Sequence, residues 1–284
     1  MSGFSASWLA LREGADHRSR NGTLARRLAG RFIDTPTLRI VDLGSGTGSN
    51  LRATAPHLGP NQEWTLVDYD PALLEEAAKA LTLWADEAKA IGDGLVLVKD
   101  GRNIGVTFRV TDLNRDLDAV LEKQPDLVTA SALFDLISTS WMARFAKAVA
   151  ASGASFYTVL TYDGRDEFVP PHPLDHAVIA AFATHQTRDK GFGPAAGPQA
   201  ASALADAFRN ANYAVETGDS PWVLDDADES LVLELLGGIA NAVGETGLVP
   251  AEGLKEWLAF RKAAAPKAGA RLVTGHTDIL AFRP

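Results

Sequence analysis

The sequence predicts an α/β protein built on a doubly wound, mostly parallel sheet. Short apolar runs of strand length alternate with longer segments of helical period from residue 38 to residue 164. Such alternation is typical of βαβ units, whose strands lie parallel. The first apolar run, LRIVDLG at 38–44, also opens a glycine-rich loop, as expected of a buried strand that turns into a helix.

The elements can be assigned in order along the chain. Apolar residues at helical spacing indicate a helix over 5–32, and Pro36 marks the break that follows. The next elements are a strand at 38–44, a helix at 49–58, a strand at 63–70, a helix at 71–92, two short strands within 95–110, a helix at 112–124, a strand passing into a loop at 125–138, a helix at 139–153 and a strand at 154–164.

The regular alternation of strands and helices ends at residue 164, and additional helices are expected after it. The elements assigned there are a helix after the prolines of 170–173, a helix at 199–211, a strand and its exit at 212–224, two helices within 227–265 and a last strand at 270–284. Trp222 is expected in the core, and the segments at 220–222 and 275–278 are expected to be turns. No internal repeat or long linker divides the chain. We therefore expect a single domain over 1–284, with an N-terminal helical cap at 1–34 and helical insertions at 165–212 and 225–268.

Composition and charge narrow the classes of function. The chain has 284 residues, a formal net charge of −9 and no cysteine, so disulfides and cysteine nucleophiles are excluded. An acidic surface disfavours nucleic acid and anionic membranes as partners. No apolar run approaches the length of a membrane span, and the first 20 residues lack the pattern of a secretory signal. We expect a cytoplasmic protein; its oligomeric state is not readable from the sequence.

The segment VDLGSGTGSN at 41–50 carries three glycines at alternate positions between a predicted strand and a predicted helix. Such a loop turns tightly and lets a ligand approach the backbone. The dinucleotide pattern G-x-G-x-x-G fails because its third glycine would fall at Ser49 or Leu51, and no G-K-[ST] completes a phosphate loop. A tight turn that binds nothing is the structural alternative.

Two carboxylates flank this loop. Asp42 lies just before the first glycine, and Asp68 ends the next strand, about 20 residues on, where a carboxylate can accept both ribose hydroxyls. Asp42 would repel a pyrophosphate but suits a ligand that carries an ammonium group. The charges therefore fit a nucleoside bearing an amino acid better than a dinucleotide.

DLGSGTG at 42–48, followed by LVDYDPALL at 66–74, resembles the class I S-adenosylmethionine-dependent methyltransferases. The resemblance runs from Leu38 to Leu160. VTDLN at 110–114 is similar to the third motif of that family, and PDLVTASALFDLIS at 125–138 is similar to the fourth. The resemblance implies a seven-stranded Rossmann-like sheet whose last strand is antiparallel and inserted between the fifth and sixth.

The resemblance also implies a role for each matched residue in binding S-adenosylmethionine. The loop residues and Asp42 would hold the methionine moiety, Asp68 the ribose and Tyr69 the adenine. Asp112 would receive the adenine amino group unless it only caps the following helix. The full implied cofactor site is Asp42, Gly44, Ser45, Gly46, Gly48, Asp68, Tyr69, Asp112, Leu113, Ala130 and Ser131.

Methyl transfer needs alignment and exclusion of water, and it needs a base only if the acceptor must lose a proton. The segment 172–198 concentrates histidines and cations in an otherwise acidic chain, which predicts a wall for a small-molecule acceptor, including an acidic one. We select His185 and Asp135 as catalytic candidates, and Lys190 and Arg188 as substrate contacts. The alternative is a solvated helix end for the first group and a capped turn for Asp135.

Further expectations concern the N-terminal helix and the competing functions. Arg12 or Arg18 would reach the methionine carboxylate if that helix covers the cofactor, or else lie on its solvent face. No metal is expected, because Pro173 separates His172 from His176 and no further ligand completes a site. Besides a small-molecule methyltransferase, the alternatives are a non-catalytic cofactor-binding partner protein and a nicotinamide-dependent oxidoreductase.

Overall fold

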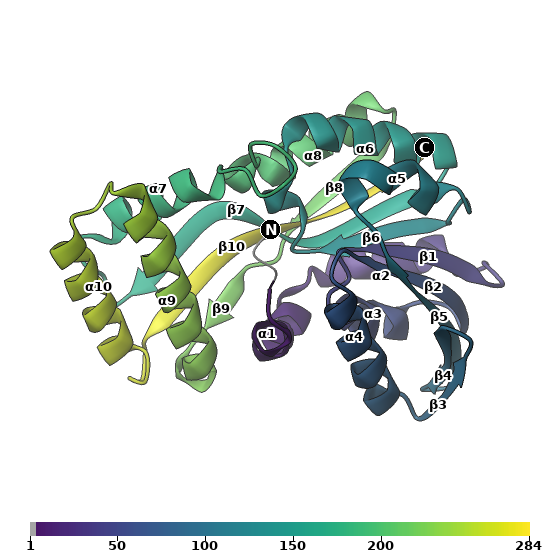
Figure 1. The fold of residues 1–284 in the computed structure, drawn as a ribbon, viewed down its shortest axis with the longest axis horizontal. Helices are drawn as coiled ribbons and strands as arrows, with labels where there is room; N and C mark the ends of the chain where they lie inside the picture. The colour runs from purple at the N-terminus through teal and green to yellow at the C-terminus, as the bar shows by residue number, and fades with distance from the viewer. Residues whose placement is uncertain (1–3) are drawn as a thin grey trace.

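A central sheet organises the computed structural model, which describes residues 4–284 (Figure 1). Its strands lie in the order β3-β4-β5-β2-β1-β6-β7-β10-β8, and β9 pairs with β10. Strands β5, β2, β1, β6 and β7 are parallel, whereas β10 runs antiparallel between β7 and β8. The strands are β1 Leu38–Leu43, β2 Asn61–Asp68, β3 Glu87–Ile91, β4 Gly94–Lys99, β5 Arg102–Val110, β6 Leu127–Ser131, β7 Ser155–Val169, β8 Ala214–Asp219, β9 Trp222–Leu224 and β10 Arg271–Phe282. The predicted α/β class, with its last strand antiparallel and inserted, is confirmed. Within residues 4–284 the sheet has ten strands and not the expected seven, because β3 and β4 extend one edge and the short β9 pairs with β10.

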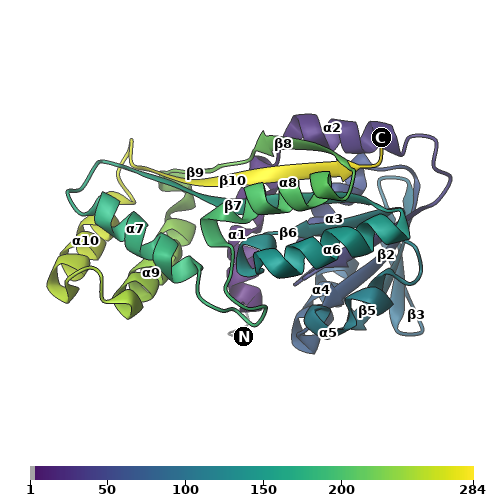
Figure 2. The same ribbon diagram turned by 90° about the horizontal axis from the view of Figure 1, so that it is seen from above.

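Helices cover both faces of the sheet, as a doubly wound fold requires. One apolar cluster joins the sheet to α1, α2 and α4, and continues into α7, α9 and α10; the other joins it to α5, α6 and α8. Figure 2 shows α2 on one side of β10, with α6 and α8 on the other. The helices are α1 Ala6–Ser19, α2 Gly22–Arg31, α3 Ser49–Thr54, α4 Pro71–Trp84, α5 Leu113–Leu121, α6 Thr139–Ser152, α7 Asp175–Gln186, α8 Ala200–Asn210, α9 Glu229–Thr246 and α10 Ala251–Ala264.

The predicted helix over 71–92 is wrong in its second half. Helix α4 ends at Trp84, and residues 87–91 form the exposed edge strand β3, which pairs antiparallel with β4. The backbone N–H of Asp86 donates to the carbonyl of Val98 at 2.8 Å, which starts this pairing. Ala and Glu favour helices and are only mildly disfavoured in strands, so pairing with β4 can override their propensity.

The predicted helix over 5–32 is two helices. Helix α1 ends at Ser19 and α2 begins at Gly22, because the side chain of Asn21 accepts hydrogen bonds from the N–H groups of Thr23 and Leu24 and so caps a new helix. Arg20 lies at the joint with an extended backbone. The joint turns the chain, so that α1 and α2 meet different parts of the sheet.

Strands β7 and β10 continue past the sheet as a long ribbon (Figure 1). At its far end α7, α9 and α10 pack together, with Arg261 of α10 bound to Asp175 of α7 at 2.5 Å. The predicted insertion 165–212 thus begins within β7, and its last helix, α8, packs on the sheet beside α6. Among residues 4–284, no helix is long and apolar enough to cross a membrane.

Candidate functional site

The glycine loop lies between β1 and α3 at the carboxyl edge of the sheet. Gly44, Gly46 and Gly48 all have left-handed backbones, with φ of 59°, 51° and 75°. Only glycine adopts this conformation without strain. The turn is fixed by a hydrogen bond from the N–H of Ser45 to the carbonyl of Val67 at 3.0 Å. The loop is therefore tied to β2, the strand that ends in Asp68.

Asp68 is half-buried at the end of β2 and faces the glycine loop. Its carboxylate accepts hydrogen bonds from the N–H of Gly46 at 2.8 Å and the N–H of Asp70 at 3.0 Å. Burial raises its pKa, and these backbone bonds oppose the shift. A carboxylate has about four acceptor positions, so acceptor capacity remains for a ribose hydroxyl. Tyr69 is 60% exposed beside it, free to lie against a ring.

Asp42 is fully buried in β1. Its Oδ1 accepts a hydrogen bond from the side-chain amide of Asn50 at 2.7 Å, but its Oδ2 has no hydrogen-bond partner among the described residues. Burial raises the pKa of Asp42 to about 7, against the opposing effects of Asn50 and Arg20. A buried polar atom without a partner is costly in a folded protein, so Oδ2 is a candidate contact for a ligand.

Arg20 is the residue that sequence reasoning missed here. Its Nη1 donates to Thr54 at 2.9 Å, whereas Nε and Nη2 are buried and unpartnered within residues 4–284. Burial lowers its pKa, and Tyr157, Asp278, Asp16 and Asp42 oppose the shift. The missed signal was the cap of Asn21, which ends α1 and turns Arg20 inward.

The arginines selected from the sequence have other partners. Arg12 binds Asp16 one turn along the same helix, through contacts of 2.9 Å and 3.1 Å. Arg18 binds Asp228 at 2.5 Å. Both arginines are thus paired with a carboxylate. Among the described residues, neither has a buried N–H group without an acceptor, whereas Arg20 has two such nitrogens.

Helix α1 covers the glycine loop, as expected of a helical cap. A Cβ atom on Gly46 would lie 2.9 Å from Cδ1 of Leu9. Arg52 of α3 binds the carboxylate of Glu13 at 2.8 and 2.6 Å, and it also donates to the carbonyl of Thr47 at 2.8 Å. One arginine therefore clamps α1 to both the loop and the helix that follows it.

The remaining implied cofactor residues lie along the same carboxyl edge. Asp112 follows β5 and caps α5 by accepting from the N–H of Asn114 at 2.9 Å, the structural role that the sequence left open. Leu113 is buried behind it. Ala130 is buried near the end of β6, and Ser131 is the half-exposed last residue of that strand.

The predicted acceptor residues divide into two groups. His185 and Arg188 both contact Glu245 of α9, at 3.1 Å and 2.7 Å, so they join α7 to α9. Asp135 lies in the loop after β6, near Arg12 and Lys190, which lower its pKa while burial raises it to about 6. Asp135 thus lies within electrostatic range of Lys190, whereas His185 contacts Glu245.

The structure pairs His276 of β10 with Tyr162 of β7, which was not expected from the sequence. The segment 275–278, predicted to be a turn, lies inside β10 instead, and its His276 pairs across the strands with Tyr162. The segment 220–222 runs into β9, where Trp222 is buried as predicted, and its Nε1 donates to Asp16 at 3.0 Å. Because β10 is inserted beside β7 only by long-range pairing, no local signal places these residues together.

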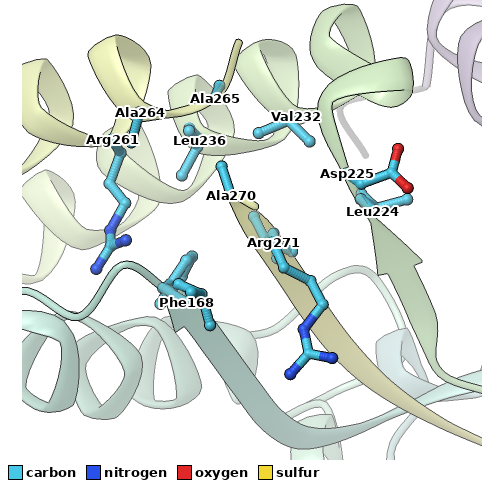
Figure 3. Close-up of a pocket in the computed structure, with 12 residues that line it drawn as sticks. Phe168, Leu224, Asp225, Val232, Leu236, Arg261, Ala264, Ala265, Ala270 and Arg271 are labelled. Carbon is cyan, nitrogen blue, oxygen red and sulfur yellow. The ribbon is translucent and has the colours of Figure 1, made fainter. Parts of the chain in front are cut away.

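The pocket in Figure 3 lies elsewhere, under α9 and α10 at the far end of the ribbon. Its wall is mainly apolar, with Phe168, Leu236 and Ala265 among its lining residues. Arg261 is also in the lining, held by Asp175 and by the carbonyl of Pro170. None of the predicted cofactor residues lines it among the residues described. This pocket is separate from the glycine loop.

Solved structures share this fold. A cyclopropane-fatty-acyl-phospholipid synthase-like protein from Lactobacillus casei is 16% identical, with a TM-score of 0.56 over 99% of this chain and 95% of that chain. A cyclopropane synthase from Mycobacterium tuberculosis is 11% identical, with a TM-score of 0.50 over 98% of this chain and 94% of that one. An S-adenosylmethionine-dependent methyltransferase from Thiobacillus denitrificans is 18% identical over 99% of both chains, but its TM-score of 0.45 is too low to bear on function.

No protein-family model matches the chain, and the comparison with curated proteins finds no relative. At identities below one fifth, the structural likeness concerns architecture alone. The sheet order, with the antiparallel β10 between β7 and β8, is the arrangement that the sequence resemblance implies. The chain has a Rossmann-like fold, which it shares with the structures of the cyclopropane synthase and the synthase-like protein.

Proposed function

We propose that the protein is an S-adenosylmethionine-dependent methyltransferase that acts on a small molecule. One observation carries this proposal. Beside the glycine loop, a buried carboxylate and a buried guanidinium, those of Asp42 and Arg20, interact electrostatically, yet each keeps polar atoms that no described protein group satisfies. The amino-acid end of S-adenosylmethionine carries an ammonium and a carboxylate, which complement these two groups.

Asp68 supports the binding of the nucleoside end of S-adenosylmethionine. Its remaining acceptor capacity suits a ribose hydroxyl, and its position at the end of β2 would leave the exposed Tyr69 beside the base. Asp42 disfavours the pyrophosphate of a nicotinamide dinucleotide, because two negative charges would meet in a buried place. The charges of the site therefore favour S-adenosylmethionine over a nicotinamide dinucleotide.

Bound there, the cofactor supplies an activated methyl group. The chain itself has to hold an acceptor in line with that methyl and exclude water. Helix α1 suits the second task, since Leu9 and the Glu13–Arg52 pair close it over the loop. Asp135, which follows β6 and lies within electrostatic range of Lys190, would then face the acceptor.

Calorimetric titration with S-adenosylmethionine, S-adenosylhomocysteine and NAD tests the proposal. We expect saturable binding of the first two, no binding of NAD, and binding at least ~10-fold weaker in Asp68→Ala, because a carboxylate hydrogen bond contributes about 1.5–3 kcal/mol. Circular dichroism of the variant controls for folding. Absence of binding at millimolar ligand would refute the proposal, and equal affinity for NAD would favour an oxidoreductase.

A further inference from the structure

Asp278 of β10 lies opposite a bulge in β7. The pairing of the two strands shifts between Thr277 and Ile279, so Asp278 alone faces residues 159 and 160 of β7. Asp278 is fully buried, and its Oδ1 accepts a hydrogen bond from the backbone N–H of Leu160 at 2.8 Å. Leu160 has a left-handed backbone, with φ of 57°, which residues other than glycine rarely adopt. The carboxylate therefore stabilises an unusual conformation of β7.

This bulge lies beside the carboxyl end of β6. Ser131, the last residue of β6 and part of the implied cofactor site, pairs with Val159. The backbone N–H of the next residue, Ala132, donates to the carbonyl of Val159 at 3.0 Å. The end of β6 is thus set against the stretch of β7 that the bond between Leu160 and Asp278 holds.

The second oxygen of Asp278 holds the joint between α1 and α2. Its Oδ2 accepts a hydrogen bond from the backbone N–H of Asn21 at 2.8 Å. Asn21 directly follows Arg20, whose Nε and Nη2 are buried without a partner within residues 4–284. Burial raises the pKa of Asp278, and the charge of Arg20 is among the effects that oppose the shift. Asp278 therefore attracts Arg20 and also fixes the backbone beside it.

We propose that Asp278 is a positioning residue of the cofactor site, which holds Arg20 and the end of β6 in place for the amino-acid end of the ligand. This inference rests on the proposed methyltransferase function. Each oxygen of one carboxylate accepts from a segment far away in the chain, Asn21 in one case and Leu160 in the other. An amide accepts through one oxygen only and would turn its own N–H groups toward the second donor. An aspartate can thus satisfy both segments, whereas an asparagine cannot.

Calorimetry with S-adenosylhomocysteine and with 5′-methylthioadenosine, which lacks the amino acid, separates this role from a merely structural one. We expect Asp278→Asn to lower the affinity for S-adenosylhomocysteine by ~10-fold or more and to leave that for 5′-methylthioadenosine unchanged, because a displaced Arg20 affects only the amino-acid end. The control Asp175→Asn breaks the pair with Arg261 at the far end of the ribbon and should change neither affinity. Equal loss of both ligands in Asp278→Asn, or loss of neither, would overturn the proposal.

Two substitutions at Asn21 test the same anchor without removing a buried charge. Asn21 has φ of −69°, which proline can adopt, but proline has no N–H to donate to Asp278. Asn21→Ala keeps that N–H, and both variants lose the side chain that caps α2. We expect S-adenosylhomocysteine to bind ~10-fold more weakly to Asn21→Pro than to Asn21→Ala, with equal binding of 5′-methylthioadenosine. Equal affinity of the two variants for S-adenosylhomocysteine would contradict the anchor.

A measurement without ligand distinguishes failure of this inference from failure of the proposed function. In protein with ¹⁵N-labelled arginine, the Nε–H resonance of Arg20 is identified by its loss in Arg20→Met, and burial of Nε predicts slow exchange with solvent. We expect this exchange to be at least ~10-fold faster in Asn21→Pro than in Asn21→Ala. Equal exchange rates would refute the hold of Asp278 on Arg20, whether or not the cofactor binds. Faster exchange in Asn21→Pro, with no binding of S-adenosylhomocysteine to the wild type, would support the anchor and refute the proposed function.

Discussion

Arg20 and Asp42 interact electrostatically beside the glycine loop, and each keeps a buried polar atom unsatisfied among the described residues. Direct pairing would have neutralised both groups, as it does Arg12 with Asp16. Instead, Arg20 donates to Thr54 and Asp42 accepts from Asn50, which leaves one face of each group free. The two free faces suit the carboxylate and the ammonium of an amino acid.

Replacement of Arg20 should weaken recognition of the amino-acid end only. We expect Arg20→Met to lower the affinity for S-adenosylhomocysteine by ~10-fold to 100-fold, the effect of losing a hydrogen bond to a charged group. Binding of 5′-methylthioadenosine, which lacks the amino acid, should be unchanged. Calorimetry with both ligands measures the difference.

The matched control is Arg18→Met, which breaks only the pair with Asp228. It should leave both affinities at wild-type values. Equal loss of both ligands in Arg20→Met would instead indicate a general disturbance of the site, and loss in Arg18→Met would restore that residue as the carboxylate contact.

Asp42 should make stability depend on pH. In the folded protein its pKa is about 7, compared with an ordinary value of 3.8, so the folded state holds a proton that the unfolded chain has released. The stability contributed by this group is fully present below pH ~4 and is lost as the pH rises through ~7. Urea titrations between pH 4 and 8 should show this decline in the free energy of unfolding.

Two changes should remove that decline. Asp42→Asn cannot titrate, and bound S-adenosylhomocysteine would favour the ionised carboxylate through its ammonium. A decline of the same size in Asp42→Asn would assign the effect to other buried carboxyl groups, such as Asp278, whose pKa is also raised by burial.

The conformation of Gly46 should couple the loop to α1. At φ of 51°, alanine costs about 1–2 kcal/mol, and its Cβ would lie 2.9 Å from Leu9. We expect Gly46→Ala to weaken binding of S-adenosylhomocysteine and to increase hydrogen exchange in α1. Gly92→Ala is the control: φ there is 56°, with open space among the described residues, so it should cost similar stability without changing either readout. Unchanged exchange in α1 would contradict the coupling.

His185, a catalytic candidate from the sequence, contacts Glu245 of α9. Its Nε2 contacts Glu245, so His185→Gln and Glu245→Gln should lower the melting temperature to a similar extent if that contact is structural. Methyl transfer should then be unaffected by either change. Loss of transfer in His185→Gln at an unchanged melting temperature would support the catalytic role that the sequence predicts.

The parts of this protein that depend on local order were predictable from the sequence. The alternation of strands and helices, the glycine loop, and the placement of Asp42 and Asp68 beside it all follow from short-range spacing, because carboxyl ends of neighbouring parallel strands meet at one edge. The edge strand at 87–91 was missed, since only its pairing with β4 distinguishes it from a helix.

Tertiary structure alone decided which of several similar side chains reach the site. The sequence does not distinguish Arg12, Arg18 and Arg20 as ligand contacts, but Asp16 and Asp228 pair with the first two, and only Arg20 among them keeps buried donors without a partner. His185 and His276 likewise have different neighbours: one meets Glu245, while the insertion of β10 buries the other against Tyr162. The partners and the burial of these side chains depend on segments far apart in the chain, so the local sequence does not predict them.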